Sequence, residues 1–311
     1  MTLQQLQYIV TLNEEKNFVS AAEKCFVTQP ALTTQIKKLE NQLGIIIFDR
    51  SKKPLIATEV GLKVIEQAKY VLLQSQKIPD LIKEYQTDLS GNLKIGILPT
   101  IGLYLLPLFI NPFLSRFPEI NVHVSENITE TIIKQLHNGS IDVGIIATPV
   151  NYKNIITIPI YYEEMYAYIS KQHAFIQNER ISTQNLVDED LWLLSSGHCF
   201  RNQMIRICKG GQKGLQHSFT YESNSIETLK RIIASKPGIT IIPELALLEV
   251  AKSEEKQIKK FDDITPIRQI SIVVNRAFLK ERLIEKLKNE IKSVLPKHML
   301  NSSGRDIVDP F

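Results

Sequence analysis

The stretch FVSAAEKCFVTQPALTTQIKKLENQLGIIIFDRSKKPLIATEVG, residues 18–61, determines the fold of the N-terminal part of the chain. Apolar residues at helical spacing predict helices over about 18–25 and 28–43, after a first helix near 3–15. The stretch then becomes basic, with a β-like piece and a turn that ends near residue 57. Short helices joined by a tight turn and followed by a basic hairpin indicate an all-α winged helix-turn-helix.

Local signals mark where these helices begin and end. Thr28 suits an N-cap, and Pro30 suits the first turn, where its missing N–H costs nothing. Gly44 suits the end of the same helix. A long periodic segment over 58–89 predicts a linker helix, which Pro79 is expected to kink or to end early.

Beyond residue 90 the pattern changes to short β-rich runs separated by helical stretches. This alternation predicts α/β layers with largely parallel strand pairing. The polar stretch from about residue 301 predicts a frayed tail. The expected strands are 93–98, 120–124, 143–147, 191–194, 238–242 and 270–274, and the expected helices are 103–116, 130–138, 226–234 and 280–294.

Composition limits the class of protein. The chain has 311 residues, which suggests two compact units or a little more at roughly 150 residues per domain. It lacks an apolar run of the ~18 residues that a membrane helix needs, and its start lacks the features of a signal peptide, so the cytoplasm is the expected compartment. Three cysteines exclude a disulfide-stapled secreted scaffold. The net charge of +4 is too weak to prove a nucleic-acid partner.

The third helix has a polar face that suits DNA. Hydroxyl and amide side chains can read base edges, and lysines can contact phosphates. Residues 33–53 hold five basic and two acidic residues, a local charge of +3. On periodicity alone, a helical bundle with a solvated charged face fits equally well. The polar face opposite Leu32, Ile36 and Leu39 comprises Thr33, Thr34, Gln35, Lys37 and Lys38.

The residues themselves favour DNA binding. The segments S-A-A at 20–22, T-Q-P-A-L-T-T-Q-I-K-K-L-E at 28–40 and F-D-R at 48–50 resemble the DNA-binding region of LysR-type transcriptional regulators. The resemblance implies double-stranded promoter DNA and RNA polymerase as partners, a dimer formed through the long helix, a tetramer as the active assembly, and no membrane. The DNA-binding residues it implies are Ser20, Thr28, Gln29, Pro30, Ala31, Thr33, Thr34, Gln35, Lys37, Arg50, Lys52 and Lys53.

The resemblance also implies how the chain is divided. It implies a C-terminal effector domain of two Rossmann-like lobes, similar to those of periplasmic binding proteins, and the strand–helix alternation fits such lobes. The implied divisions are a DNA-binding domain at 1–58, a linker helix at 59–90, a regulatory domain at 91–300 and a tail at 301–311, with one lobe from 92–163 plus 267–300 and the other from 164–266.

A second motif lies in the regulatory part. The segment S-G-H-C-F-R-N-Q at 196–203, followed by Cys208, resembles the redox centre of the peroxide-sensing members of that family. The segment 98–102, Phe219 and the segment 225–229 also agree. The resemblance implies that hydrogen peroxide is sensed by Cys199 and that Cys208 resolves the product. It implies a peroxide pocket made of Thr100, Thr129, His198, Arg201, Asn202 and Arg268, with no cofactor and no metal.

The chemistry of a thiol sensor adds its own expectations. A thiolate attacks the O–O bond of a peroxide and becomes a sulfenic acid, so the thiol pKa is expected to be lowered. Cys199 should lie in the first turn of a helix, where the dipole favours an anion, and Arg201 should stabilise the charge. Arg206 and Lys209 should favour a thiolate at Cys208.

Geometry predicts a structural switch. If residues 199–208 form one helix, the two cysteines are separated by roughly 13 Å along its axis. A disulfide needs Cα atoms within about 7 Å, so the bond requires this segment to unwind. Trp192, the only tryptophan, lies on the expected strand 191–194 just before the motif and should report the change through its fluorescence.

Other interpretations stay open at this point. Two cysteines nine residues apart are often packing residues, and the chain could be a LysR-type regulator of a small organic effector that binds between the lobes. A thiol peroxidase enzyme would leave residues 1–90 without a role, so the chain is not expected to be an enzyme. Cys25 is expected to be inert core. Peroxide-sensing members usually carry Asp where this chain has Asn202, which puts its oxidation rate in doubt.

Overall fold

The computed structural model describes residues 1–84, 90–186, 191–208, 225–235, 237–276, 281–302 and 305–310. The chain divides into two compact units, Met1–Tyr85 and Gln86–Phe311. Phe219 and Lys209 lie outside the described residues. In the described part of the chain, none of the helices is both long and apolar enough to cross a membrane.

The first unit is a winged helix-turn-helix with a long helix behind it. Its helices are α1 (Leu3–Glu15), α2 (Phe18–Lys24), α3 (Gln29–Leu43) and α4 (Glu59–Glu84). The wing is an antiparallel pair of short strands, β1 (Phe48–Asp49) and β2 (Ile56–Ala57). The core between the helices is fully buried and includes Ile9, Leu12, Leu32, Ile36 and Leu39. The fold predicted for this part of the chain is confirmed.

The predicted ends of α3 are confirmed at both sides. Thr28 is the N-cap, with its Oγ1 accepting a hydrogen bond from the Ala31 N–H at 3.4 Å. Gly44 adopts a left-handed φ of 68°, which ends the helix. The early end expected at Pro79 is wrong, because α4 continues to Glu84. One missing N–H removes a single hydrogen bond, and a long helix tolerates that loss.

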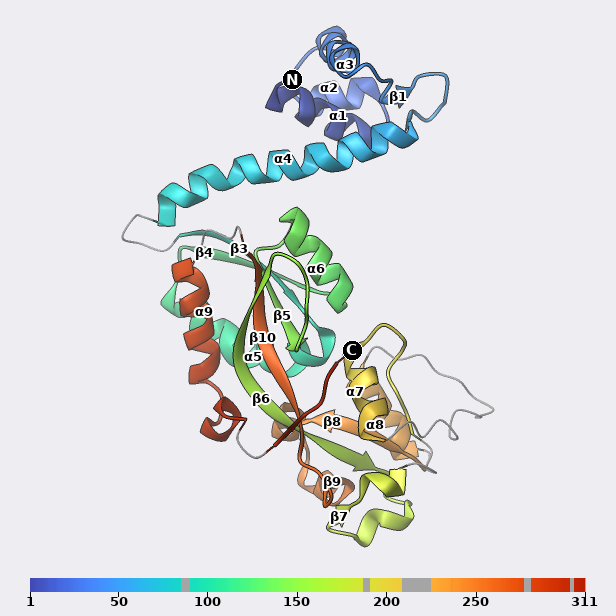
Figure 1. Cartoon of the computed structure of the whole chain (residues 1–311), viewed down its shortest axis with the longest axis vertical. Coiled ribbons are helices and arrows are strands. Elements are labelled where there is room, and N and C mark those ends of the chain that lie inside the picture. Colours follow the sequence, from blue (N-terminus) through green and yellow to red (C-terminus); the bar gives the residue numbers. More distant parts are fainter. Residues whose placement is uncertain are drawn as a thin grey trace. The chain divides into compact units, whose positions relative to one another are not determined.

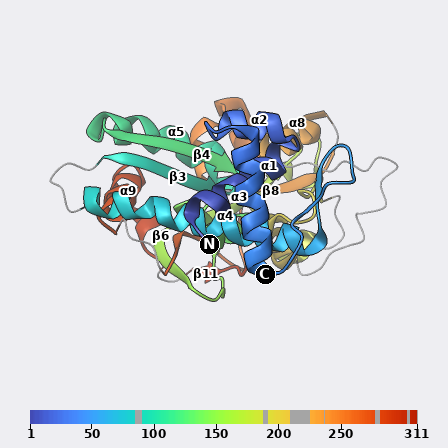
Figure 2. The ribbon, with the colours of Figure 1, turned by 90° about the horizontal axis from the view of Figure 1, so that it is seen from above.

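The second unit is built on a nine-stranded mixed sheet in the order β4-β3-β5-β10-β6-β9-β7 (Figure 1). Off this path, β8 pairs with β6 and β11 pairs with β10. Figure 2 shows β3 and β4 side by side, with α5 (Pro99–Arg116) running along them. The strands are β3 (Gly91–Ile97), β4 (Ile120–Glu126), β5 (Val143–Thr148), β6 (Ile155–Ile169), β7 (Arg180–Ile181), β8 (Ile239–Pro243), β9 (Ile258–Phe261), β10 (Pro266–Asn275) and β11 (Asp306–Ile307).

Helices cover this sheet. α6 packs on β5 and β10, α8 packs on β8, and α5 packs on β4 and α9. The helices are α5 (Pro99–Arg116), α6 (Thr129–Asn138), α7 (Cys199–Ile207), α8 (Ile226–Ser235) and α9 (Glu281–Ser293). Short 3-10 turns are Ala174–Gln177, Thr183–Leu186, Glu244–Glu249, Lys252–Gln257 and Lys297–Leu300.

The expectation of largely parallel pairing is wrong for the centre of the sheet. β3 is parallel to β4 and β5, but β10 is antiparallel to both β5 and β6. Strand–helix alternation does not determine the direction of a strand that returns from the second half of the chain, and β10 is such a strand. β6 was not expected. It pairs with β10 through Glu164 and with β8 from Met165 onward, so it runs through both halves of the sheet.

Two further expectations are corrected. Residues 191–194 do not form a continuous strand, because only Leu191, which pairs with Ile239, and Leu194 are in isolated bridges before the chain turns into α7. The tail is not frayed at residues 305–308, because β11 pairs with β10 and the Val308 N–H donates to the Ile267 carbonyl at 2.8 Å.

Candidate functional site

Cys199 is the first residue of α7 and is buried, with 4% of its surface exposed. Gly197 has a φ of +91°, which suits glycine and turns the chain toward the helix. His198 then takes the extended N-cap position and is also buried. The thiol therefore lies at the positive end of the α7 dipole, which favours an anion there, as the sequence predicts.

Two threonines sit at the starts of two other helices. Thr100 lies in the first turn of α5 and Thr129 is the first residue of α6, and both are buried. A Cβ placed on Gly197 would lie 3.8 Å from Ile128 Cδ1, so the start of α6 lies against the turn before Cys199. Thr129 Oγ1 is buried without an ordinary hydrogen-bond partner among the described residues, and its hydroxyl favours the thiolate of Cys199.

Arg268 supplies the positive charge of the site. It stands on β10 with 1% of its surface exposed and donates to Thr100 Oγ1 at 3.1 Å and to the Thr100 carbonyl at 2.9 Å. Its Nε donates to Glu163 Oε1 at 2.6 Å, and its Cζ lies 4.7 Å from the centre of the Phe200 ring. The guanidinium is thus fixed on all sides by groups that are themselves buried.

Burial and the neighbouring polar groups shift the pKa of the Cys199 thiol in opposite directions. Burial raises the pKa of Cys199, while the charge of Arg268, the Thr129 hydroxyl and the Phe200 N–H act to lower it. Burial is the largest effect, so the expected net lowering is wrong in this conformation. Burial also raises the pKa of Glu163, and its ion pair with Arg268 counteracts that shift.

The role expected for Arg201 is also corrected. Its Nη1 donates to the Leu194 carbonyl at 2.6 Å, and Arg268 is the arginine that stabilises the Cys199 thiolate. Residues two apart on a helix point in different directions, so nearness in sequence is misleading here. Asn202 is exposed, and its Nδ2 donates to the Pro310 carbonyl at 3.2 Å.

Cys208 caps the other end of α7. It is fully buried, and burial raises the pKa of its thiol to about 12. The prediction that Arg206 favours a thiolate at Cys208 is therefore wrong in this conformation. The Nη1 atom of Arg206 instead lies 3.8 Å from Oδ2 of Asp309. The nine-residue helix between the cysteines corresponds to a separation of roughly 13 Å, as expected from the sequence. Both cysteines are free.

The expected DNA-binding residues divide into exposed and anchored groups. Lys37, Lys52 and Lys53 are exposed, as are Thr28, Gln29, Pro30, Ala31 and Thr34, whereas Ser20 and Thr33 are half-buried. Gln29 Nε2 donates to Thr33 Oγ1 at 3.2 Å.

Two of these residues are held by partners that sequence reasoning missed. Gln35 Oε1 accepts from Gln5 Nε2 at 3.1 Å, and Arg50 pairs with Glu40 at 2.7 Å. Glu40 also accepts the N–H groups of Ile47 and Phe48, so it holds the wing as well as Arg50.

Glu163 was likewise missed. It lies within the apolar run of β6 and pairs with a residue 105 positions away, and a lone acidic residue in such a run gives no motif signal. Cys25, expected to be core, is half-buried at the C-cap of α2.

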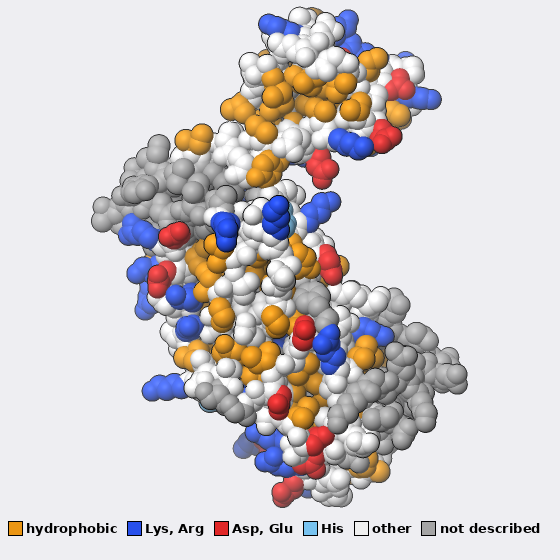
Figure 3. Space-filling view, in the orientation of Figure 1, with side chains coloured by type: hydrophobic (Ala, Val, Ile, Leu, Met, Phe, Trp, Pro, Cys, Tyr) orange, Lys and Arg blue, Asp and Glu red, His pale blue; other side chains and the backbone are white. Residues whose placement is uncertain are grey.

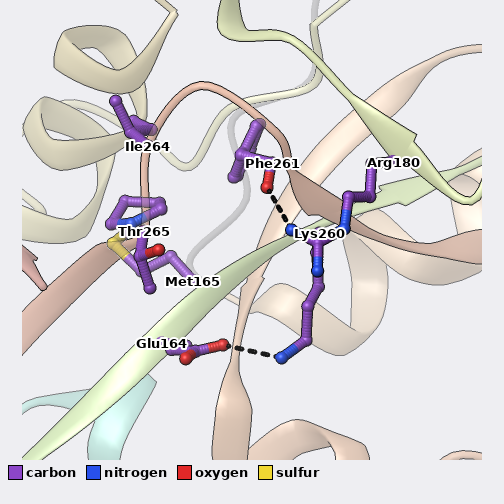
Figure 4. A pocket seen from close by; sticks show the side chains of 8 residues that line it. Glu164, Met165, Arg180, Lys260, Phe261, Ile264 and Thr265 are labelled. Atoms are coloured by element: carbon purple, nitrogen blue, oxygen red, sulfur yellow. Dashed lines mark hydrogen bonds and ion pairs between the residues drawn. The ribbon is translucent and has the colours of Figure 1, made fainter.

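A separate cavity of 120 Å³ lies among β6, β7, β9 and the start of β10 (Figure 4). Its charged side chains already have partners: Lys260 pairs with Glu164 at 3.3 Å, and Arg180 donates to the Phe261 carbonyl at 3.4 Å. The cavity contains neither a thiol nor a histidine. Of these two places in the described structure, the cluster around Cys199 is the one that holds a thiol.

Comparisons with known proteins agree with this geometry. A family profile described as "LysR substrate binding domain" matches residues 86–296, and one described as "Bacterial regulatory helix-turn-helix protein, lysR family" matches residues 3–62. A "Hydrogen peroxide-inducible genes activator" of Haemophilus influenzae is 34% identical over 304 residues, covering 95% of this chain and 99% of that protein. The "DNA-binding transcriptional dual regulator OxyR" of Escherichia coli is 32% identical over 247 residues, covering 79% and 80%.

Solved structures give the same result. A full-length OxyR from Pseudomonas aeruginosa, with its cysteine replaced by aspartate, has a TM-score of 0.73 and 35% identity, covering 94% of this chain and 98% of that one. An H2O2-bound cysteine mutant of OxyR from Corynebacterium glutamicum has a TM-score of 0.63 and 27% identity, covering 94% and 92%. The profile of the substrate-binding domain alone spans more than half of the chain. The chain belongs to the family of LysR-type transcriptional regulators.

Proposed function

We propose that this protein is a hydrogen-peroxide-sensing, DNA-binding transcriptional regulator of oxidative-stress genes, switched by a disulfide between Cys199 and Cys208. The observation that carries the proposal is the buried cluster in which Cys199 lies beside the Thr129 hydroxyl and the Arg268 guanidinium. A relative that matches 95% of this chain is named a hydrogen peroxide-inducible genes activator, and one solved relative is an H2O2-bound form.

The first chemical step is attack of the Cys199 thiolate on one peroxide oxygen. The S–O bond forms as the O–O bond breaks, which leaves a sulfenic acid and hydroxide that takes up a proton to become water. Thr129 offers the peroxide a hydroxyl that favours the Cys199 thiolate, and Thr100 offers one that already accepts from Arg268. The Arg268 charge stabilises both the thiolate and the negative charge that develops on the departing oxygen.

The second step joins the two cysteines. The sulfur of Cys208 attacks the sulfenic sulfur of Cys199, the S–O bond breaks, and the departing hydroxide leaves as water with the Cys208 proton. Because the two residues stand at opposite ends of a helix, the bond requires α7 to unwind. Unwinding also removes Cys208 from the environment that raises its pKa.

In our proposal, the N-terminal unit binds DNA, and the unwinding of α7 regulates transcription through it. Exposed Lys37, Lys52 and Lys53 bind phosphates, and Gln29, Thr33 and Thr34 read bases. Figure 3 shows hydrophobic side chains gathered on one face of this unit. Large apolar residues of the unit that are about half exposed include Leu3, Val60 and Leu62. A second copy covers such a face through α4 in a dimer, and two dimers form a tetramer that contacts RNA polymerase.

Mass spectrometry of tryptic fragments before and after stoichiometric hydrogen peroxide tests the proposal. We expect a Cys199–Cys208 disulfide in the wild type and unmodified Cys25 as the internal reference. Cys199→Ser should not react at Cys208, whereas Cys208→Ser should stop at the sulfenic acid or over-oxidise. An unmodified Cys199, or a disulfide that includes Cys25, would overturn the proposal.

A further inference from the structure

The segment 305–310, which we call the strap, joins β10 to α7. On the β10 side, β11 pairs with Pro266 and Ile267, and the Val308 N–H donates to the Ile267 carbonyl at 2.8 Å. Ile267 directly precedes Arg268, the charged residue of the site. The strap is therefore bonded to the strand that carries the site's arginine.

On its other side the strap holds the middle of α7. Gln203 is fully buried, and its Nε2 donates to the Val308 carbonyl at 2.7 Å. Asn202 Nδ2 adds a bond to the Pro310 carbonyl at 3.2 Å, and Arg206 lies 3.8 Å from Asp309. The last two contacts involve exposed side chains, so Gln203 carries most of the attachment.

Gln203 lies four residues after Cys199 on the same face of the helix. Its bond anchors the helix at a point between the two cysteines. Unwinding residues 199–208 moves this point relative to β10, because the two ends of the helix must come roughly 6 Å closer. The Gln203 bond must break during that movement unless the strap follows it.

We propose that the strap and Gln203 lower the rate of the second step, disulfide formation, and leave the rate of the first step, sulfenic-acid formation, unchanged. Gln203 is a positioning residue, which acts by stabilising the helical form of α7 through its bond to the strap. This inference rests on the proposed function and adds a control point to it. Attack of Cys208 on the Cys199 sulfenic acid, with loss of water, is slow as long as the strap holds the helix.

Two rate constants separate this role from a general structural one. Stopped-flow mixing with peroxide in the Cys208→Ser background measures sulfenic-acid formation, and quenched-flow mass spectrometry in the Cys208 protein measures disulfide formation. Gln203→Leu keeps the volume and removes the donor. We expect disulfide formation to become about fivefold faster, the value for one lost buried hydrogen bond, with sulfenic-acid formation unchanged within twofold.

Gln257→Leu is a matched control, because Gln257 is also buried and donates from Nε2 to a backbone carbonyl, that of Ile169, at 3.0 Å. It should leave both rates unchanged. A chain without residues 305–311 should form the disulfide at least as fast as Gln203→Leu, and adding Gln203→Leu to that chain should have less than a twofold further effect. This non-additivity shows that Gln203 acts through the strap.

Hydrogen exchange of the reduced proteins provides a second readout that does not depend on chemistry. The amides of 203–208 should exchange faster in Gln203→Leu than in Gln257→Leu. Equal rates of disulfide formation in the wild type and Gln203→Leu overturn the proposed role of Gln203 and the strap, as does an equal acceleration of both chemical steps. A wild type that forms no disulfide with peroxide instead overturns the proposed function, so the two failures are distinguishable.

Discussion

At the scale of single residues, the buried charge of Arg268 affects the pKa of the Cys199 thiol. Its guanidinium lowers the pKa of Cys199 against the effect of burial, and Glu163 holds it in place. Because peroxide reacts with the thiolate, the oxidation rate should rise with pH as Cys199 deprotonates. A stronger positive charge shifts that rise to lower pH, and a weaker one shifts it to higher pH.

Arg268→Gln should therefore raise the pKa of Cys199 and slow oxidation at neutral pH by about tenfold or more, since it removes a positive charge that favours the thiolate. The pH profile of Cys199 alkylation in Cys208→Ser measures the shift. Arg201→Gln is the comparison, because its guanidinium binds the Leu194 carbonyl and should move the profile much less. A larger shift with Arg201→Gln would contradict the assignment of roles to the two arginines.

The two threonines should respond differently to loss of their hydroxyls. Thr129→Val should slow oxidation without loss of stability, because Thr129 Oγ1 has no ordinary partner among the described residues. Thr100→Val should also lower the free energy of unfolding by about 1–3 kcal/mol, because it leaves an Arg268 N–H unpaired. Urea unfolding and stopped-flow oxidation measure the two effects. Oxidation rates within twofold of the wild type for both variants would argue against a peroxide site at these hydroxyls.

At the scale of elements, the predictable parts were those whose signal is local. The caps and apolar stripe of α3 lie within sixteen residues, so the sequence alone locates that helix. The resemblance also selected Cys199, Thr100, Thr129 and Arg268, which the structure brings together.

The missed elements depend on distant partners. β6 became recognisable only through its pairing with β10 more than 100 residues later, and β11 is ordered by β10 and Gln203 rather than by its own polar sequence. Sequence periodicity contains no information about such partners.

The connection between Trp192 and α7 gives an optical prediction at this scale. The main chain of Trp192 is bonded to β8 through the Ile239 carbonyl and the Thr240 hydroxyl, both at 2.8 Å. Two residues later, the Leu194 carbonyl accepts from Arg201 of α7, so we expect unwinding of α7 to break a bond two residues from Trp192 in the chain. Tryptophan emission should therefore change with the kinetics of disulfide formation and reverse with a dithiol reductant.

Stopped-flow fluorescence of the wild type and Cys208→Ser checks the assignment. The change should be absent or slower in Cys208→Ser, which cannot form the bond. Identical traces, or constant emission while mass spectrometry shows complete disulfide formation, would mean that the rearrangement of α7 does not extend back to Leu194 and Trp192.

At the scale of the whole molecule, the redox site must influence a DNA-binding unit that folds around its own core. The total charge of +4 is small, so DNA affinity must come from a local surface rather than from the net charge of the chain. We propose that the exposed lysines of α3 and the wing supply that surface, whereas Arg50 pairs with Glu40 and is expected mainly to stabilise the wing.

The lysines and the polar residues of α3 should therefore affect DNA binding in different ways. Lys52→Ala should weaken binding to all sequences and reduce the slope of log affinity against log salt by about one unit, since one phosphate contact is lost.

Gln29→Ala should cost about 1–3 kcal/mol on the specific site and little on random DNA, because an amide reads a base edge. Fluorescence anisotropy with the full chain at several salt concentrations, on a specific and a random duplex, separates the two effects. Arg50→Ala should instead lower the unfolding free energy of the N-terminal unit, because Glu40 loses its cationic partner. Equal losses on both duplexes for Lys52→Ala and Gln29→Ala would mean that α3 does not read bases.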